Sequence, residues 1–107
     1  MSWASRAKEL LRQGKPAEIK PRGTSMTGLV EDGQVVVVEP IDDAKRPITK
    51  GDVVLCHVHG REYLHLVLAI RGQQPACSYL IGNNHGRANG WVGRHAIYGR
   101  MRCDQPA

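Results

Sequence analysis

The 107-residue sequence contains no phenylalanine, and two tryptophans and three tyrosines are its only large aromatic residues. The core must therefore consist mainly of valine, leucine and isoleucine. Few aromatic rings are available to form a surface on which successive nucleotide bases stack. No apolar run exceeds a few residues, which argues against a membrane-spanning helix and the apolar core of a signal peptide. We expect no contact with a membrane.

The cysteines are few and their spacing has no pattern. Cys56, Cys77 and Cys103 are odd in number and include no Cys-x-x-Cys pair, which indicates neither a disulfide framework nor a zinc site. Reduced thiols in the cytoplasm fit this usage best. His57 and His59 share one face of an expected strand, but no third ligand has matching spacing. We therefore expect no metal and no other cofactor.

Positive charge is in excess but is not concentrated. The formal net charge is +5, yet the basic residues do not form a run of five to eight. A solvated basic surface explains this better than a nucleic-acid interface, although contact with nucleic acid or an acidic partner stays open.

Twelve glycines and six prolines indicate many turns between short elements. Residues 1–14 are predicted to form a helical arm, with Ser2 as its cap, apolar residues at helical spacing to about Gln13, and Gly14 as a left-handed stop. Residues 15–107 are predicted to form one β domain. This pattern favours a mainly β fold, a small barrel-like antiparallel sheet with one amino-terminal helix.

Within the β domain, the valine run at 35–38 predicts a strand buried on both faces. Residues 53–58 and 62–70 predict a hairpin, residues 78–81 a short strand, and 82–93, rich in glycine and asparagine, a loop. The last strand is predicted at 95–101, with Ile97 and Met101 on one face.

The second hairpin strand alternates strictly, so its side chains divide into two sets. Four aliphatic residues share one face and four residues share the other. The first set is Leu64, Leu66, Leu68 and Ile70, and the second is Tyr63, His65, Val67 and Ala69. His65 is thus an ionisable group in the middle of an apolar strand, and it needs a polar partner there.

Ser25 lies on a glycine-flanked bend just before an acidic turn and the valine run. A serine hydroxyl is a weak nucleophile at its free pKa and requires a neighbouring base. On its spacing alone, Ser25 is better explained as a turn or helix-capping residue.

Five short motifs then occur in an order that is typical of one family. They are Gly23-Thr24-Ser25-Met26, the turn and strand at 31–38, Lys50-Gly51-Asp52-Val53-Val54, Tyr63-Leu64-His65-Leu66-Val67, and the pair 79–84 and 96–100. Over residues 22–101 the chain resembles the signal-peptidase and SOS-repressor self-cleavage superfamily of serine peptidases. The resemblance implies that Ser25 is the nucleophile, that Gly23 and Met26 line the substrate groove, and that an extended peptide or protein segment is the substrate.

The residue at the base position decides the subtype. No lysine lies in the strand after the Gly-Asp motif, and His65 stands there, similar to the Ser-His version of archaeal and endoplasmic-reticulum signal peptidases. Asn83 and Asn89 stand where the family has acidic residues, so they are the candidate orienters of His65, and Gly28 replaces a proline. The same two asparagines leave a second hypothesis open, an inactive member of the fold that binds protein or nucleic acid.

Overall fold

The computed structural model describes residues 4–21, 26, 28–73 and 76–102. Within them, seven strands form one antiparallel sheet in the order β1-β2-β7-β3-β4-β5-β6. The elements are α1 (Ser5–Arg12), β1 (Ala17–Ile19), β2 (Val36–Glu39), β3 (Val53–Val58), β4 (Arg61–Arg71), β5 (Ser78–Gly82), β6 (Ala88–Gly93), the 3-10 helix η1 (Arg94–Ala96) and β7 (Ile97–Met101).

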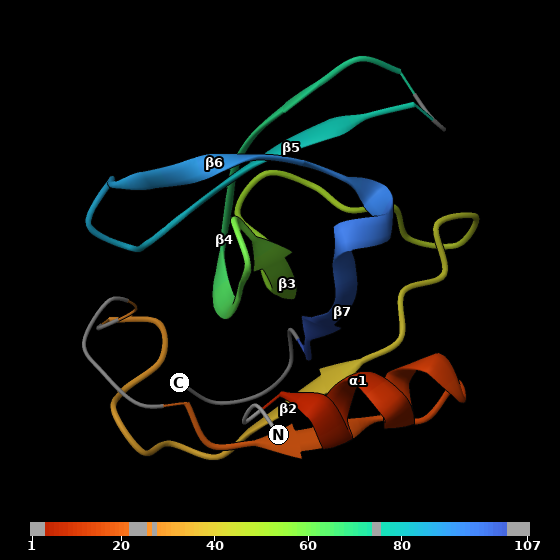
Figure 1. Ribbon diagram of the computed structural model, residues 1–107, viewed down its shortest axis with the longest axis vertical. Helices are drawn as coiled ribbons and strands as arrows, with labels where there is room; N and C mark the ends of the chain where they lie inside the picture. Colours follow the sequence, from red (N-terminus) through yellow and green to blue (C-terminus); the bar gives the residue numbers. More distant parts are fainter. Residues whose placement is uncertain (1–3, 22–25, 27, 74–75, 103–107) are drawn as a thin grey trace.

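The fold is mainly β, as predicted, but the sheet is not a barrel. The strands at the two ends of the order, β1 and β6, do not pair with each other among the described residues. They lie at opposite ends of the molecule, with β3, β4 and β7 between them (Figure 1). The prediction of a barrel-like closure is therefore wrong, because the sheet ends in two edge strands.

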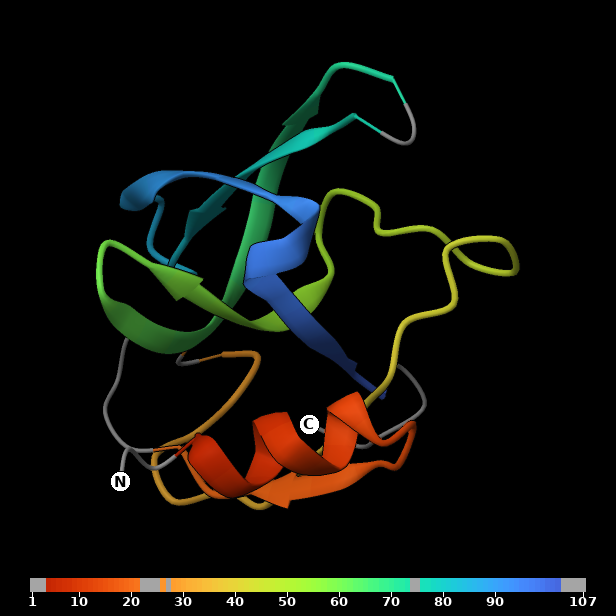
Figure 2. The ribbon, with the colours of Figure 1, turned by 45° about the vertical axis from the view of Figure 1, so that its right-hand side comes forward.

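The amino-terminal helix is shorter than predicted. It begins at Ser5, and Ala4 at its N-cap makes no side-chain capping bond, while Ser2 lies outside the described residues. Gly14 has a φ of +80° and provides the predicted left-handed stop. The helix lies along β1 (Figure 2), and its buried residues Ala7 and Leu11 join the core there.

The core consists of two clusters of buried apolar side chains. Cluster 1 joins α1, β1 and β2 to β3 and β4, and cluster 2 joins β3, β4, β5 and β7. Both β3 and β4 contribute to the two clusters, and β3 sends Leu55 to cluster 1 and Val54 to cluster 2. In the valine run, by contrast, Val36 is buried and Val35 is 51% exposed. The prediction that this run is buried on both faces is wrong. The strand that is buried on both faces is β3.

Irregular pairing shifts side chains from one face of the sheet to the other. In β4, Val67 pairs with Ile81 and Ala69 with Leu80, which leaves Leu68 as the extra residue of a β-bulge. Beyond this bulge Ile70 packs with cluster 2, whereas Leu64 belongs to cluster 1. The predicted leucine and isoleucine face is therefore broken.

A second bulge has the same effect on the last strand. Leu55 pairs with Gly99 and Cys56 with Ile97, so Tyr98 is the extra residue in β7. Ile97 consequently packs in cluster 2 and Met101 against cluster 1, and the prediction that they share a face is wrong.

The predicted loop at 82–93 contains a strand. Residues Ala88–Gly93 form β6, which pairs along β5 over the whole of that strand. Only the segment between Gly82 and Ala88 is a turn. The glycine and asparagine content of this stretch concealed a strand whose stability comes from its neighbour rather than from its own residues.

Candidate active site

The imidazole of His65 lies inside the sheet, on β4 opposite Val54 of β3. The residue is only 6% exposed, and the Tyr63 ring stacks on it with a centroid separation of 4.6 Å and an interplanar angle of 28°. His65 and Arg100 are the two buried polar or charged residues of the part of the chain that the structure describes. His65 is thus a buried group that must be hydrogen-bonded.

Asn89 supplies a hydrogen bond to this histidine. Its Oδ1 atom lies 3.0 Å from His65 Nδ1. An amide oxygen can only accept, so Nδ1 donates, and in the neutral ring Nε2 is then the lone-pair nitrogen. Asn89 thereby selects the tautomer in which Nε2 can act as a base.

A β-bulge aims the Asn89 side chain at His65. Gly90 pairs with Ile81 and Ala88 pairs with Gly82, so Asn89 is the extra residue between them and has no partner on β5. Bulges of this kind re-aim a side chain and are common beside active sites. The contact therefore depends on β6 being a strand with one inserted residue.

The environment keeps His65 neutral. Burial lowers its pKa from the usual 6.5, and the hydrogen bond that Nδ1 donates to Asn89 acts in the opposite direction but does not cancel the effect of burial. At neutral pH the ring is therefore unprotonated and able to take a proton.

Ser25 and Gly23 lie outside the described residues, but Met26 and Gly28 are described. Met26 is 5% exposed and packs in cluster 1, the cluster that contains Leu64, the neighbour of His65. Gly28 lies against the loop after β5, because a Cβ atom added to it would be 3.1 Å from Asn84 Nδ2.

Asn83, the other candidate orienter, is occupied by the turn between β5 and β6. Its Oδ1 accepts hydrogen bonds from the backbone N–H of His85 at 2.9 Å and of Arg87 at 3.0 Å. Its own N–H donates to the Arg87 carbonyl at 2.9 Å. The described contacts of Asn83 thus stabilise the turn, and the contact with His65 belongs to Asn89.

The motif at 50–54 meets the motif at 96–100, and the sequence did not reveal this contact. Arg100, 7% exposed, donates from Nη1 to Asp52 Oδ2 at 2.8 Å and from Nη2 to the Arg46 carbonyl at 2.7 Å. The backbone of Asp52 accepts from the N–H of Val67, two residues after His65, at 2.9 Å. The ion pair therefore joins the turn before β3 to β7, and the backbone hydrogen bond joins the same turn to β4, the strand that carries His65. Both motifs were visible in the sequence, but nothing in it paired them.

Other titratable groups near this strand are poor candidates for catalysis. Burial, with a smaller effect of the Glu62 carboxylate, raises the pKa of Cys56 to about 12, so its thiol stays protonated and is not nucleophilic. The His57 ring contacts the Glu62 carboxylate. Among the described residues, no three His, Cys, Asp or Glu side chains are grouped to hold a metal ion.

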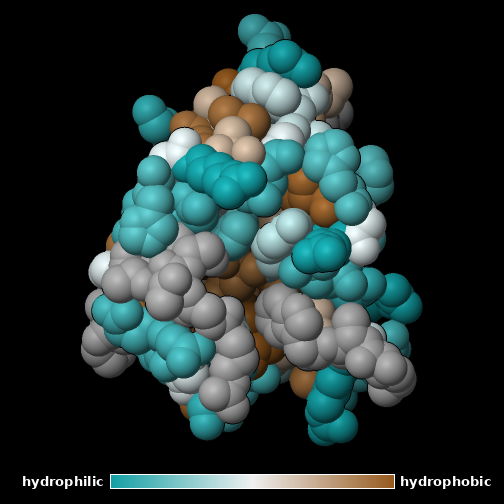
Figure 3. All heavy atoms as spheres, turned by 60° about the vertical axis from the view of Figure 1, so that its left-hand side comes forward, coloured by the Kyte–Doolittle hydropathy of each residue, from teal (hydrophilic) through white to brown (hydrophobic). Residues whose placement is uncertain are grey.

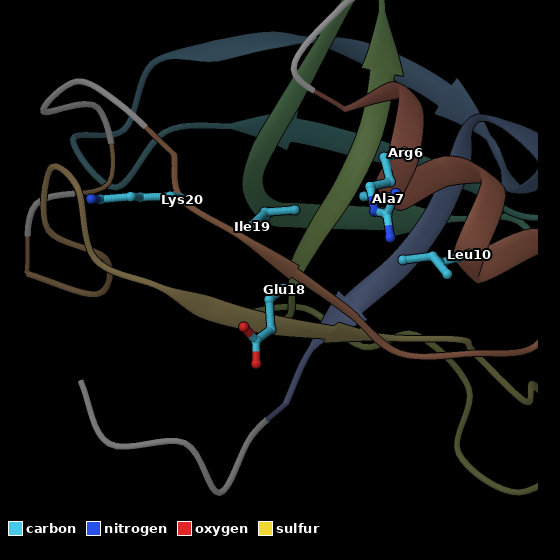
Figure 4. A pocket seen from close by; sticks show the side chains of 6 residues that line it. All are labelled: Arg6, Ala7, Leu10, Glu18, Ile19 and Lys20. Carbon is cyan, nitrogen blue, oxygen red and sulfur yellow. The ribbon is translucent and has the colours of Figure 1, made fainter.

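A pocket of about 490 Å³ lies elsewhere, between α1 and β1. It is lined by Arg6, Ala7, Leu10, Glu18, Ile19 and Lys20 (Figure 4). Three strands separate β1 from β4 in the sheet order, and the lining contains neither a histidine nor a hydroxyl nucleophile. This pocket is therefore distinct from the His65 site.

Comparisons with protein-family models, with curated proteins and with solved structures found no match to this chain. The functional interpretation therefore depends on the motifs and on the geometry around His65. Within the described ranges, no helix is long and apolar enough to cross a membrane.

Proposed function

We propose that this protein is a serine-peptidase-like domain that hydrolyses a peptide bond with a Ser25-His65 dyad. The observation that carries the proposal is the state of His65, which is buried, neutral and hydrogen-bonded through Nδ1 to Asn89. The hydrogen bond to Asn89 selects the tautomer whose Nε2 can accept a proton, and this is the form that a general base requires.

The reaction follows from this arrangement. His65 Nε2 takes the proton of the Ser25 hydroxyl as its oxygen attacks the peptide carbonyl, and the imidazolium then gives that proton to the leaving amine. Water, deprotonated by the same nitrogen, hydrolyses the ester that remains on Ser25. Asn89 orients the ring, but as a neutral amide it stabilises the imidazolium less than a carboxylate would.

Two observations support Ser25 as the nucleophile. It lies within the Gly-x-Ser-Met motif that the resemblance identifies, and Met26 and Gly28 on its carboxyl-terminal side pack toward the elements around His65.

The proposed substrate is an extended peptide that pairs with a strand edge. β6 is an edge strand of the described sheet and carries Asn89, so a peptide along it would pass close to His65. On the face shown in Figure 3, hydrophobic side chains are exposed near the centre, with hydrophilic side chains above them.

A fluorophosphonate probe tests the proposal, because it labels only an activated serine. We expect labelling of the wild-type protein, none in Ser25→Ala, and a loss of about 10³-fold or more in the labelling rate of His65→Gln. Ser78→Ala, which changes a half-buried serine of β5, is the matched control and should label normally. An unlabelled wild type, or a labelled Ser25→Ala, would remove the peptidase function.

The second candidate function is a non-catalytic module that binds single-stranded nucleic acid. The observation in its favour is Trp91 on β6, which is 39% exposed and has the Arg71 guanidinium 4.2 Å from its ring centroid. An exposed aromatic ring beside a cation is the platform on which bases stack.

This alternative predicts an oligonucleotide mobility shift that weakens steeply with salt and is lost in Trp91→Ala. It also predicts no labelling by the fluorophosphonate probe. A shift that is unchanged in Trp91→Ala would contradict this role for Trp91.

A further inference from the structure

The tip of the β3–β4 hairpin packs against β6 next to Asn89, the residue that contacts His65. Between Val58 and Arg61 the chain reverses through His59 and Gly60, whose φ angles are +48° and +84°. Two successive positive φ angles are the mark of a type I′ turn, in which Asn-Gly is the favoured pair. His59 is the non-glycine residue with positive φ in the described part of the chain.

The His59 ring lies against the residue that follows Asn89. A Cβ atom placed on Gly90 would be 2.8 Å from His59 Nε2 and 3.6 Å from Val58 Cγ1. The φ angle of Gly90 is +151°, a conformation that residues with a side chain rarely adopt. The backbone just after the bulge therefore needs glycine both for its conformation and for its close approach to the hairpin tip.

We propose that His59 and Gly90 are positioning residues for His65, because they lock the bulge that directs Asn89 at its ring. His59 acts on Gly90, Gly90 fixes the path of β6, and Asn89 holds the ring in the tautomer with a proton on Nδ1. An asparagine at 59 would satisfy the type I′ turn better, so the histidine ring contributes something other than turn formation. That contribution is the contact with Gly90.

The inference deepens the proposed function, since a fixed tautomer matters most for a general base, but its test requires no turnover. Long-range ¹H–¹⁵N spectra report which imidazole nitrogen carries the proton, and His65→Gln identifies the His65 signals. We expect the wild type at pH 7.5 to show His65 as a single tautomer with the proton on Nδ1. Asn89→Ala should lose it and show the tautomer with the proton on Nε2 as well.

His59→Asn is the decisive variant, because it keeps or improves the turn while it removes the ring. We expect a folded protein that nevertheless loses the single tautomer of His65. Gly90→Ala should do the same, and its combination with Asn89→Ala should add nothing, because both changes break one contact. Gly86→Ala is the matched control: Gly86, in the turn between β5 and β6, also has a positive φ, +87°, but nothing lies within 4 Å of an added Cβ.

The outcomes separate the two proposals. Retention of the single tautomer in His59→Asn, or in a folded Gly90→Ala, would overturn the positioning role, and so would its loss in Gly86→Ala. If Gly90→Ala does not fold, His59→Asn alone decides. A protein that shows the expected tautomers but no labelling by the fluorophosphonate probe would retain this positioning device and lose the peptidase function.

Discussion

Two buried polar side chains are held in opposite ways. Arg100 on β7 is bound by the Asp52 carboxylate and by backbone carbonyls, including that of Arg46, so it stays charged and ties the segment before β3 to the sheet. His65 on β4 has the amide of Asn89 as its hydrogen-bond partner and is kept neutral by burial. The difference shows that one sheet holds two polar side chains by different means, because a paired charge is compensated by its partner whereas a neutral imidazole needs only a hydrogen bond.

The largest effect is expected when the compensated charge is removed. Arg100→Ala leaves the Asp52 carboxylate, which is 19% exposed, without its cation, and breaking a largely buried pair in this way costs up to about 3–5 kcal/mol of unfolding free energy. Urea denaturation measures the loss. Arg102→Ala is the control, since its ion pair with Glu39 is about 40% exposed on both sides and contributes about 0–1 kcal/mol. Equal losses in the two variants would contradict the structural role of Arg100.

A smaller effect is expected when the neutral partner is replaced by a charged one. Asn89→Asp places a carboxylate beside His65 Nδ1, which should raise the pKa of His65 and stabilise the imidazolium. If the dyad is active, kcat/KM should rise about tenfold or more, because the reverse change in a Ser-His-Asp triad costs about 10⁴.

Peptide hydrolysis and NMR titration measure the two effects of Asn89→Asp. Asn83→Asp is the matched control, since its side chain serves the β5–β6 turn and should leave the His65 titration unchanged. A lower His65 pKa in Asn89→Asp would show that the amide does not face the ring as described.

The smallest effect concerns pH. Because burial lowers the pKa of His65 below the usual 6.5, the unfolded chain binds a proton at a higher pH than the native protein does. This contribution to stability is complete above pH 6.5, and it falls as the pH decreases until the native ring is protonated too. We expect the urea midpoint to decrease between pH 7.5 and 5.5, and to decrease less in His65→Gln. An equal decrease in both would remove His65 as the cause.

Local patterns in the sequence predicted part of the fold. The β3–β4 hairpin, the strand at β5 and the stop at Gly14 follow from alternation, turn residues and glycine conformation, and the structure has them. The sequence also singled out His65 as a group in need of a partner, and it offered Asn89 and Asn83 equally. Only the inserted residue in β6 distinguishes the two, because it directs Asn89 at the ring while Asn83 closes the turn.

The β-bulges explain why the predicted side-chain faces of β4 and β7 are wrong. A period of two predicts faces correctly until one strand gains a residue relative to its neighbour, and then every later side chain changes sides. This occurs at Leu68 in β4 and at Tyr98 in β7. Such an insertion depends on the register of two strands that are distant in sequence, so no local pattern contains it.

By itself, the order of residues determined that this chain forms short strands around a valine, leucine and isoleucine core, and that an imidazole lies within one of them. Tertiary structure decided which partner that imidazole has, because the glycine and asparagine segment forms β6 in an open sheet and a bulge turns Asn89 toward the ring. The physical reason is that apolar periodicity and turn conformation are local free energies, whereas register and buried hydrogen bonds exist only after distant strands have paired.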